Sequence, residues 1–269
     1  MSPPTTSFEL SHAGRPIHVT ELGKGEPAIL LLSGLGDPAL WWFRLPTPDE
    51  ARPHWRGNIG EQRSGVAPRL ATTARVVAYD RAGIGNSPAP DHDRTWAEIY
   101  AELEAVLAAL NLTQPPVLVG HSLGGLIAYT YARRYPQAVG GLVLLDATPP
   151  PLSQPPSVPM PERLALTHFE PDELAPEALG HLPLSIVSPG RALTVAEAAE
   201  EGRNGTPDAL SARFEKRRAQ HEQLLSTSTR SRAVWTVSPS HYVHLDEPDV
   251  VTEAILSVWE LTQKRKPQK

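Results

Sequence analysis

Six stretches of the chain are short apolar runs without polar alternation, a pattern typical of strands buried on both faces of a parallel sheet. Two further strand-like segments, SFEL and PIHVTEL, open the chain with Ala13 and Gly14 as the turn between them. The apolar runs are PAILLLS (27–33), ARVVAYD (74–80), PVLVG (116–120), VGGLVLLD (139–146), LPLSIVS (182–188) and SRAVWTVS (231–238). Together they predict about eight strands.

Helical periodicity appears between these runs. Apolar residues recur at helical spacing over 95–110, where Thr95 and Glu98 form a capping box. A second helix is expected over 126–135, ending before Pro136, and a third over 247–263, with Pro248 in its first turn. Strands that alternate with helices imply right-handed crossovers. The fold class is therefore α/β, a mostly parallel sheet with helices on both faces and two antiparallel strands at its start.

The domain organisation follows from length and proline content. A chain of 269 residues suits one α/β domain over 1–269. Segment 147–182, between the sixth and seventh strands, contains nine prolines in 36 residues. These forbid one long helix but permit a small cap of short helices.

The composition of the chain argues against several classes of function. A net charge of −5 gives no reason to expect nucleic acid as a partner, and without cysteine the chain has no disulfide, thiolate metal site or thiol nucleophile. No histidine pair has a convincing metal-ligand spacing, so no metal is expected. The N-terminus lacks the features of a secretory signal, and no apolar run approaches the ~18 residues of a membrane span. We therefore expect a cytoplasmic protein without a membrane partner.

One serine lies in a distinctive setting. Residues 120–124, Gly-His-Ser-Leu-Gly, fit the pattern G-x-S-x-G directly between a predicted strand and a predicted helix. This is the context of a nucleophile elbow, a strained turn that presents the serine hydroxyl and needs neighbours with almost no side chain. Ser122 could instead be an ordinary helix N-cap, but a cap needs no glycine on both sides. We predict that Ser122 is a nucleophile.

At this point the chain resembles the α/β-hydrolase superfamily, and specifically bacterial serine hydrolases of the esterase and iminopeptidase-like group. The resemblance rests on GHSLGG (120–125), LLSGLGD (31–37), YDRAGIGNSPAP (79–90) and the segment that begins at His241. It implies a Ser–acid–His triad in that chain order, a cap after the sixth strand and no cofactor. It also implies an oxyanion hole made by the backbone N–H groups of Leu35 and Leu123, although Ser33 stands where the family more often has histidine. Asp80 is implied to be structural.

The base and the acid are assigned with alternatives. His241 occupies the position of the family's catalytic histidine, and His244 is its rival. Many members carry the acid after the seventh strand, where residues 188–195 have no carboxylate. Asp146 ends the sixth strand beside Ser122, an edge from which some members take the acid, and can fix the imidazole tautomer from there, although it could instead be a structural cap of the next segment. Asp208 is the runner-up for the acid.

The substrate is the least determined feature. Trp41, Trp42 and His121 are expected to wall an apolar pocket, although the tryptophans could equally pack a helix onto the sheet. The predicted function is that of a carboxylesterase acting on small or medium apolar esters, small molecules, through an acyl-enzyme. Iminopeptidase or amidase, C–C hydrolase, lactonase and perhydrolase activities remain open, as does a non-catalytic ligand receptor, because fold analogy does not choose among them. An iminopeptidase would need cap carboxylates for a free amine, with candidates Glu162, Glu170, Asp172, Glu173 and Glu177.

Overall fold

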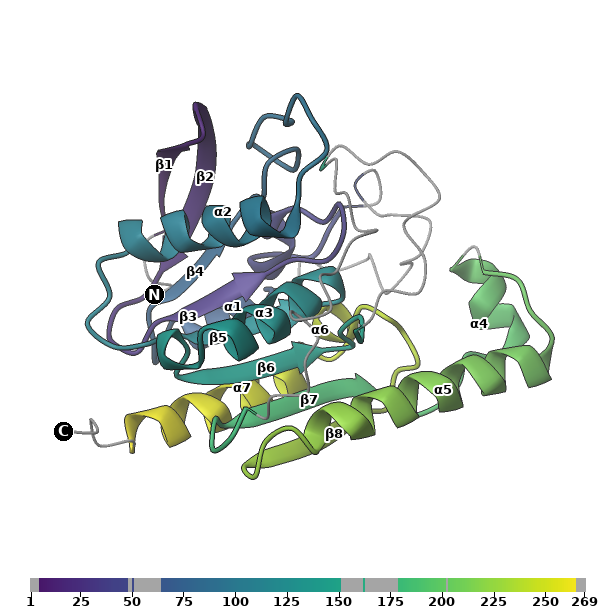
Figure 1. The fold of residues 1–269 in the computed structure, drawn as a ribbon. Helices are drawn as coiled ribbons and strands as arrows, with labels where there is room; N and C mark the ends of the chain where they lie inside the picture. The colour runs from purple at the N-terminus through teal and green to yellow at the C-terminus, as the bar shows by residue number, and fades with distance from the viewer. Residues whose placement is uncertain are drawn as a thin grey trace.

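The computed structural model describes residues 5–47, 50, 64–150, 162, 179–201 and 203–264. These residues form an eight-stranded sheet in the order β1-β2-β4-β3-β5-β6-β7-β8 (Figure 1). The strands are β1 (Thr6–His12), β2 (Arg15–Leu22), β3 (Ile29–Leu32), β4 (Val76–Tyr79), β5 (Val117–His121), β6 (Gly141–Leu145), β7 (Leu184–Pro189) and β8 (Ser231–Thr236). Neighbours from β4 to β8 are parallel, whereas β1 with β2 and β2 with β4 are antiparallel. The predicted α/β class and mostly parallel sheet are confirmed.

The helices surround this sheet. They are α1 (Val66–Leu70), α2 (Trp96–Ala109), α3 (Leu123–Arg134), α4 (Val195–Glu200), α5 (Pro207–Leu225), α6 (Val243–Asp246) and α7 (Pro248–Gln263), with 3-10 turns η1 (Ala39–Trp42) and η2 (Pro136–Ala138). The three predicted helices correspond to α2, α3 and α7, and the capping box of Thr95 and Glu98 is present. The apolar pattern predicts neither α4 nor α5.

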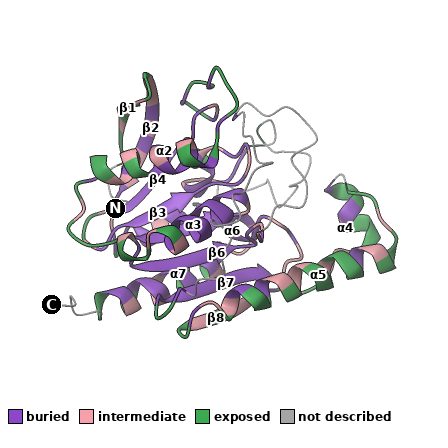
Figure 2. Cartoon of the chain, in the orientation of Figure 1, coloured by how far each residue is buried: buried purple, intermediate pink, exposed green. Residues whose placement is uncertain are grey.

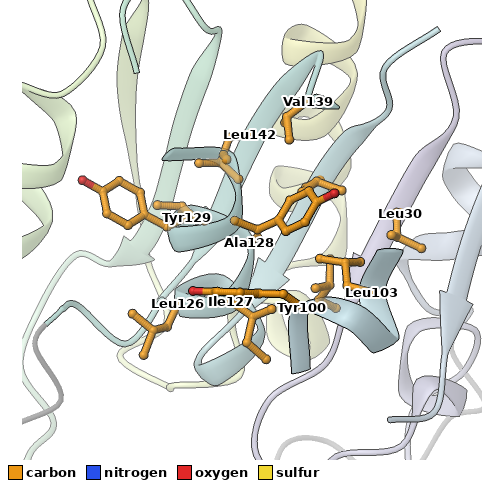
Figure 3. Close-up of a cluster of buried hydrophobic side chains, with 14 of the residues drawn as sticks. Leu30, Tyr100, Leu103, Leu126, Ile127, Ala128, Tyr129, Val139 and Leu142 are labelled. Atoms are coloured by element: carbon orange, nitrogen blue, oxygen red, sulfur yellow. The ribbon is translucent and has the colours of Figure 1, made fainter. Parts of the chain in front are cut away.

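The apolar runs are continuous because successive residues serve two different cores. In β3, Leu30 and Leu32 belong to the core under α2 and α3, whereas Ile29 and Leu31 belong to the core under α1 and α7. Figure 2 shows the central strands buried between the helices, and Figure 3 shows Tyr100 and Leu103 of α2 in the same buried cluster as Ile127 of α3. This packing on both faces fixes the register of the strands, and with it the loops at their carboxyl ends.

The long connections are described only in part. Strand β6 ends at Leu145 and β7 begins at Leu184, so the predicted cap, residues 147–182, falls between them. Its two expected short helices lie outside the described residues, apart from Glu162 and residues 179–182. Within the described ranges, no helix has the length and apolar character needed to cross a bilayer.

Candidate active site

Ser122 lies on a sharp turn between β5 and α3. Its backbone has φ +52° and ψ −116°, a conformation that side-chain-bearing residues rarely adopt. The turn requires glycine on both sides, because a Cβ on Gly120 would collide with the backbone of Gly124, and a Cβ on Gly124 with the backbone of Leu32. The Ser122 side chain makes no capping hydrogen bond to α3 and is partly exposed. Ser122 therefore holds the N-cap position of α3 without acting as a side-chain cap, and its backbone geometry fits a nucleophile elbow.

The turn is fastened to the end of β6. The Ser122 N–H donates to the Leu145 carbonyl at 3.1 Å, and the Thr148 N–H donates to the Ser122 carbonyl at 2.9 Å. Asp146 follows Leu145 directly and also has a positive φ, +36°. Ser122 and Asp146 are therefore held at neighbouring strand ends by backbone hydrogen bonds.

Asp146 is hydrogen-bonded to His241. The Nδ1 atom of His241 lies 2.5 Å from Oδ2 of Asp146, so Nδ1 carries the hydrogen and the neutral ring keeps its lone pair on Nε2. Asp208, the alternative acid, is exposed in the first turn of α5. His244, the alternative base, is buried with its ring 4.5 Å from that of Trp42. Among the candidates from the sequence, the structure brings Asp146 and His241 together.

A cation that was not predicted from the sequence lies beside Asp146. Arg217, on α5, places Nε 3.2 Å from Oδ1 of Asp146 and Nη2 3.0 Å from its main-chain carbonyl oxygen. Burial alone would raise the pKa of the Asp146 carboxyl, but Arg217, together with His241 and His221, lowers it well below its ordinary value. Asp146 is therefore ionised at neutral pH.

A second missed residue, His221, lies one turn farther along α5 and is fully buried. Its Nε2–H donates to the Ala147 carbonyl at 2.9 Å, and its Nδ1 accepts from the Ser188 hydroxyl at 2.8 Å. Burial lowers the pKa of His221, which keeps the ring neutral and suits this pair of bonds. The i, i+4 spacing of Arg217 and His221 was the available signal, once the segment is recognised as a helix.

His121 is hydrogen-bonded to the backbone of His241. Its Nε2–H donates to the His241 carbonyl at 2.9 Å, its Nδ1 lies 3.6 Å from Oδ2 of Asp37, and the side chain is buried. Burial lowers the pKa of His241 to about 4, against the opposing effect of Asp146. His241 is thus neutral at pH 7 and able to accept a proton.

The two tryptophans expected in the pocket are both core residues. Trp42 donates through Nε1–H to the Ser33 hydroxyl at 2.9 Å, and Trp41 packs edge-on against Tyr242. Neither tryptophan, nor His121, is among the described residues that line the cavity beside Ser122. The alternative interpretation, packing of this segment onto the core, fits their positions.

The loop after β3 is held by a buried ion pair. Arg81 donates to the carbonyls of Ser33 and Gly34 at 2.6 Å each, and its guanidinium binds both carboxylate oxygens of Glu162. Glu162 also accepts from the Gly36 N–H at 2.5 Å and is fully buried. Because Arg81 and Gly36 occupy this carboxylate, Glu162 is not placed to receive a substrate amine. The other four cap acids lie outside the described residues.

Leu35 and Leu123 are the two residues whose N–H groups were expected to form an oxyanion hole. Within the described part of the chain, the N–H groups of Leu35 and Leu123 have no backbone acceptor. Asp80 is structural, because its carboxylate accepts from the N–H groups of Ala39 at 2.8 Å and Asn86 at 2.9 Å. These two bonds join the segment after the β3 loop, at Ala39, to the turn after β4, at Asn86.

Ser122, Asp146 and His241 open onto one cavity of about 370 Å³, a size that suits a small organic molecule. Over residues 5–47, 64–150, 179–201 and 203–264, no group of three or more metal-ligating side chains comes together. The cavity is lined by Ser122, Asp146, Thr148, Ser188, Pro189, Arg191, Ala192, Leu193, Arg203, Leu210, Arg213, Phe214, Arg217, Arg218, His221, Trp235, Pro239 and His241.

Comparisons with known proteins agree with this architecture. Residues 27–173 match the family model described as alpha/beta hydrolase fold. An uncharacterised protein of Bacillus subtilis, YqjL, is 31% identical over 201 residues, which cover 68% of this chain and 72% of YqjL. A haloalkane dehalogenase of Sphingobium indicum is 31% identical over 133 residues, 48% of this chain and 41% of the dehalogenase.

A solved structure of a thermophilic esterase from Thermogutta terrifontis has a similar fold. It superposes with a TM-score of 0.67 at 18% identity and covers 96% of this chain and 99% of the esterase. At this identity the likeness concerns the fold alone. The family match covers more than half of the sequence and agrees with the sheet order, the elbow and the resemblance in the motifs. The chain belongs to the α/β-hydrolase family.

Proposed function

We propose that the protein is a serine carboxylesterase that hydrolyses small-molecule esters through an acyl-enzyme. The observation that carries the proposal is the 2.5 Å bond between His241 and Asp146, in a cavity that also contains the strained Ser122. A nucleophile, a base and an orienting carboxylate are the three parts of this chemistry. In this chain each part follows a different strand and opens onto the same space.

In the proposed reaction, Nε2 of His241 accepts the Ser122 hydroxyl proton as Oγ attacks the ester carbonyl. The N–H groups of Leu35 and Leu123 stabilise the oxyanion that forms. His241 then returns the proton to the departing alkoxide, so the alcohol leaves and Ser122 keeps the acyl group. Water, deprotonated by His241, repeats the attack and releases the acid.

Asp146 holds Nδ1–H of His241 and stabilises the imidazolium during each transfer. Arg217 keeps this carboxylate ionised. The low pKa of His241 means that the base is in its neutral form from weakly acidic pH upward.

Two alternatives find less support. Alkyl-enzyme chemistry, as in dehalogenation, is disfavoured because the elbow residue is Ser122 rather than an aspartate. Release of N-terminal residues from peptides would require a free carboxylate for the amine, and Glu162 is paired with Arg81. Ester hydrolysis needs neither an aspartate nucleophile nor a free carboxylate for an amine.

The test is the intact mass after brief exposure to a fluorophosphonate probe, followed by ester turnover. We expect one rapid adduct on the wild type, none on Ser122→Ala, and slow labelling of His241→Ala and Asp146→Asn. Asp208→Asn is the matched control for Asp146→Asn, because Asp208 is exposed on α5, and it should label at the wild-type rate. Slow labelling of Asp208→Asn with fast labelling of Asp146→Asn would reassign the acid, and an unlabelled, folded wild type would overturn the proposal.

A further inference from the structure

One face of α5 forms a wall of the cavity. Its lining residues follow the i, i+3, i+4, i+7 pattern of a single helix face. They are Leu210, Arg213, Phe214, Arg217, Arg218 and His221. Figure 1 shows α5 extending past the ends of β7 and β8 toward α4, so this face continues outward from the site.

The charged groups along the cavity are unbalanced. Arg191 and Arg203 join the three arginines of α5, which gives five guanidinium groups in the lining, whereas Asp146 is the one carboxylate among the described lining residues. The acids that pair with the outer arginines, such as Glu197 with Arg191 and Glu222 with Arg218, are not in the lining. A guanidinium has five N–H donors, so an arginine paired with one carboxylate keeps donors for a second anion.

Arg213 is the arginine best placed to meet a ligand. Its Nη1 donates to the Asn204 carbonyl at 3.2 Å, and in the described part of the chain it has no carboxylate partner. It lies four residues before Arg217, which is a displacement of about 6 Å along the helix. Since Arg217 contacts Asp146, an anion bound by Arg213 would lie about one helical turn outward from the contact between Arg217 and Asp146, in the cavity that Ser122 also lines.

Apolar side chains also contribute to the cavity wall. Leu193, Leu210, Phe214 and Trp235 line the cavity, and the Arg218 guanidinium lies 5.0 Å above the Trp235 ring. A ligand that matches this wall has a short hydrocarbon part next to the scissile ester and an anionic oxygen group beyond it.

We propose that the substrate is an ester with a carboxylate or phosphate-type group at one end, separated from the ester carbonyl by a short apolar spacer. This rests on the proposed esterase function and narrows its substrate class. Hydrolysis adds one water, breaks the acyl C–O bond and releases acid and alcohol, while the distant anion is unchanged.

The kinetic test compares esters that differ in one group. Benzyl valerate is neutral, monobenzyl glutarate replaces its terminal methyl by carboxylate, and the benzyl ester of 4-phosphonobutanoate replaces it by phosphonate. A fourth ester, 4-carboxybenzyl valerate, moves the charge to the alcohol. Release of the alcohol is followed by chromatography. We expect at least one anionic ester to exceed benzyl valerate about tenfold in kcat/KM, an advantage that shrinks as salt is raised.

Variants assign the preference to a residue. Arg213→Gln should reduce the ratio of anionic to neutral kcat/KM to near one. Arg230→Gln is the control, because Arg230 is exposed before β8, at the amino end of that strand, and the ratio should stay at the wild-type value. An equal loss in both variants would indicate a general effect of charge and would overturn the assignment to the cavity.

A binding arm separates this proposal from the esterase proposal. Calorimetric titration of Ser122→Ala with monobenzyl glutarate, the phosphonobutanoate ester, 4-carboxybenzyl valerate and benzyl valerate needs no turnover. Tighter binding of an anionic ester, lost in Ser122→Ala/Arg213→Gln, supports the anion site even if the wild type hydrolyses nothing. Rapid hydrolysis of benzyl valerate with no anionic preference in either arm would leave the esterase intact and overturn the substrate class.

Discussion

Arg217 binds Asp146 through both the side chain and the backbone of that residue. Its Nε and Nη2 atoms contact the carboxylate at 3.2 and 3.4 Å, and Nη2 also lies 3.0 Å from the main-chain carbonyl oxygen. The guanidinium therefore fixes the orientation of the carboxylate and adds a positive charge close to the His241 pair. A residue in this position should affect both the rate and the pH dependence of the reaction.

The acid limb of the pH–rate profile tests this electrostatic coupling. The proposed mechanism needs neutral His241, and burial lowers the pKa of His241 to about 4, so kcat/KM should remain high well below pH 6.5 and fall toward pH 4. Arg217 helps to depress this pKa, so Arg217→Gln should move the limb to higher pH and reduce the plateau by about 10-fold to 100-fold.

Profiles are compared over the pH range in which circular dichroism shows each protein folded. A limb for Arg217→Gln at or below the wild-type position would contradict the coupling, whatever happens to the plateau. Lysine at this position keeps the positive charge but lacks the planar guanidinium that makes several hydrogen bonds at once. Compared with Arg217→Gln, Arg217→Lys should therefore bring the acid limb closer to its wild-type pH than it brings the plateau to its wild-type rate.

The elbow should reduce the stability of the fold. Ser122 has a positive φ that glycine tolerates, so Ser122→Gly should raise the free energy of unfolding by about 1 kcal/mol relative to Ser122→Ala, which keeps a Cβ in the strained turn. Both variants lack the hydroxyl, so the comparison isolates the backbone. Urea unfolding measures the difference, and equal stabilities would argue against strain at this position.

The buried pair of Arg81 and Glu162 should contribute much more than an exposed one. The two side chains are 2% and 0% exposed, so Glu162→Gln leaves a buried guanidinium without its counter-charge and should cost about 3–5 kcal/mol. The pair of Arg44 and Glu50 is partly exposed, and Glu50→Gln should cost less than about 1 kcal/mol. A Glu162→Gln protein as stable as Glu50→Gln would refute the structural role assigned to this pair.

Buried histidines predict loss of stability in mild acid. Burial, with His121 and His241 nearby, lowers the pKa of His244 well below 6.5. Below pH 6.5 His244 therefore binds a proton in the unfolded chain but stays neutral in the folded protein, so the free energy of unfolding decreases as the pH falls. His244→Phe removes this titratable group. Between pH 6 and 5 the unfolding free energy of the variant should therefore decline by about 1 kcal/mol less than that of the wild type. Parallel declines would contradict the assignment.

Much of this architecture was predictable because it is encoded locally. Each apolar run and the glycines around Ser122 lie within a few residues of the feature they determine. The pairing of Asp146 with His241 spans 95 positions. His241 was implied by the resemblance to the family, and Asp146 by its place at the carboxyl edge of the sheet beside Ser122. The sequence alone could therefore nominate both residues.

The contacts of α5 were not accessible in this way. Among the residues of this helix, only Leu210, His221 and Leu224 are buried, so its apolar pattern is weak, although Thr206 and Pro207 mark its start. The interactions of Arg217 and His221 reach 71 and 74 positions back in the chain. Trp41 and Trp42 show the opposite error, because aromatic residues after the loop suggested a pocket wall but pack in the core.

The shared position of α5 constrains how this enzyme can be re-engineered. The same helix holds Asp146 through Arg217 and contributes arginines to the cavity, so a change made near its inner end to alter selectivity would also disturb the machinery of turnover. The outer turn, with Leu210, Arg213 and Phe214, lies beyond those contacts. Directed evolution restricted to this turn should change the substrate preference while the contact of Arg217 with Asp146 stays in place.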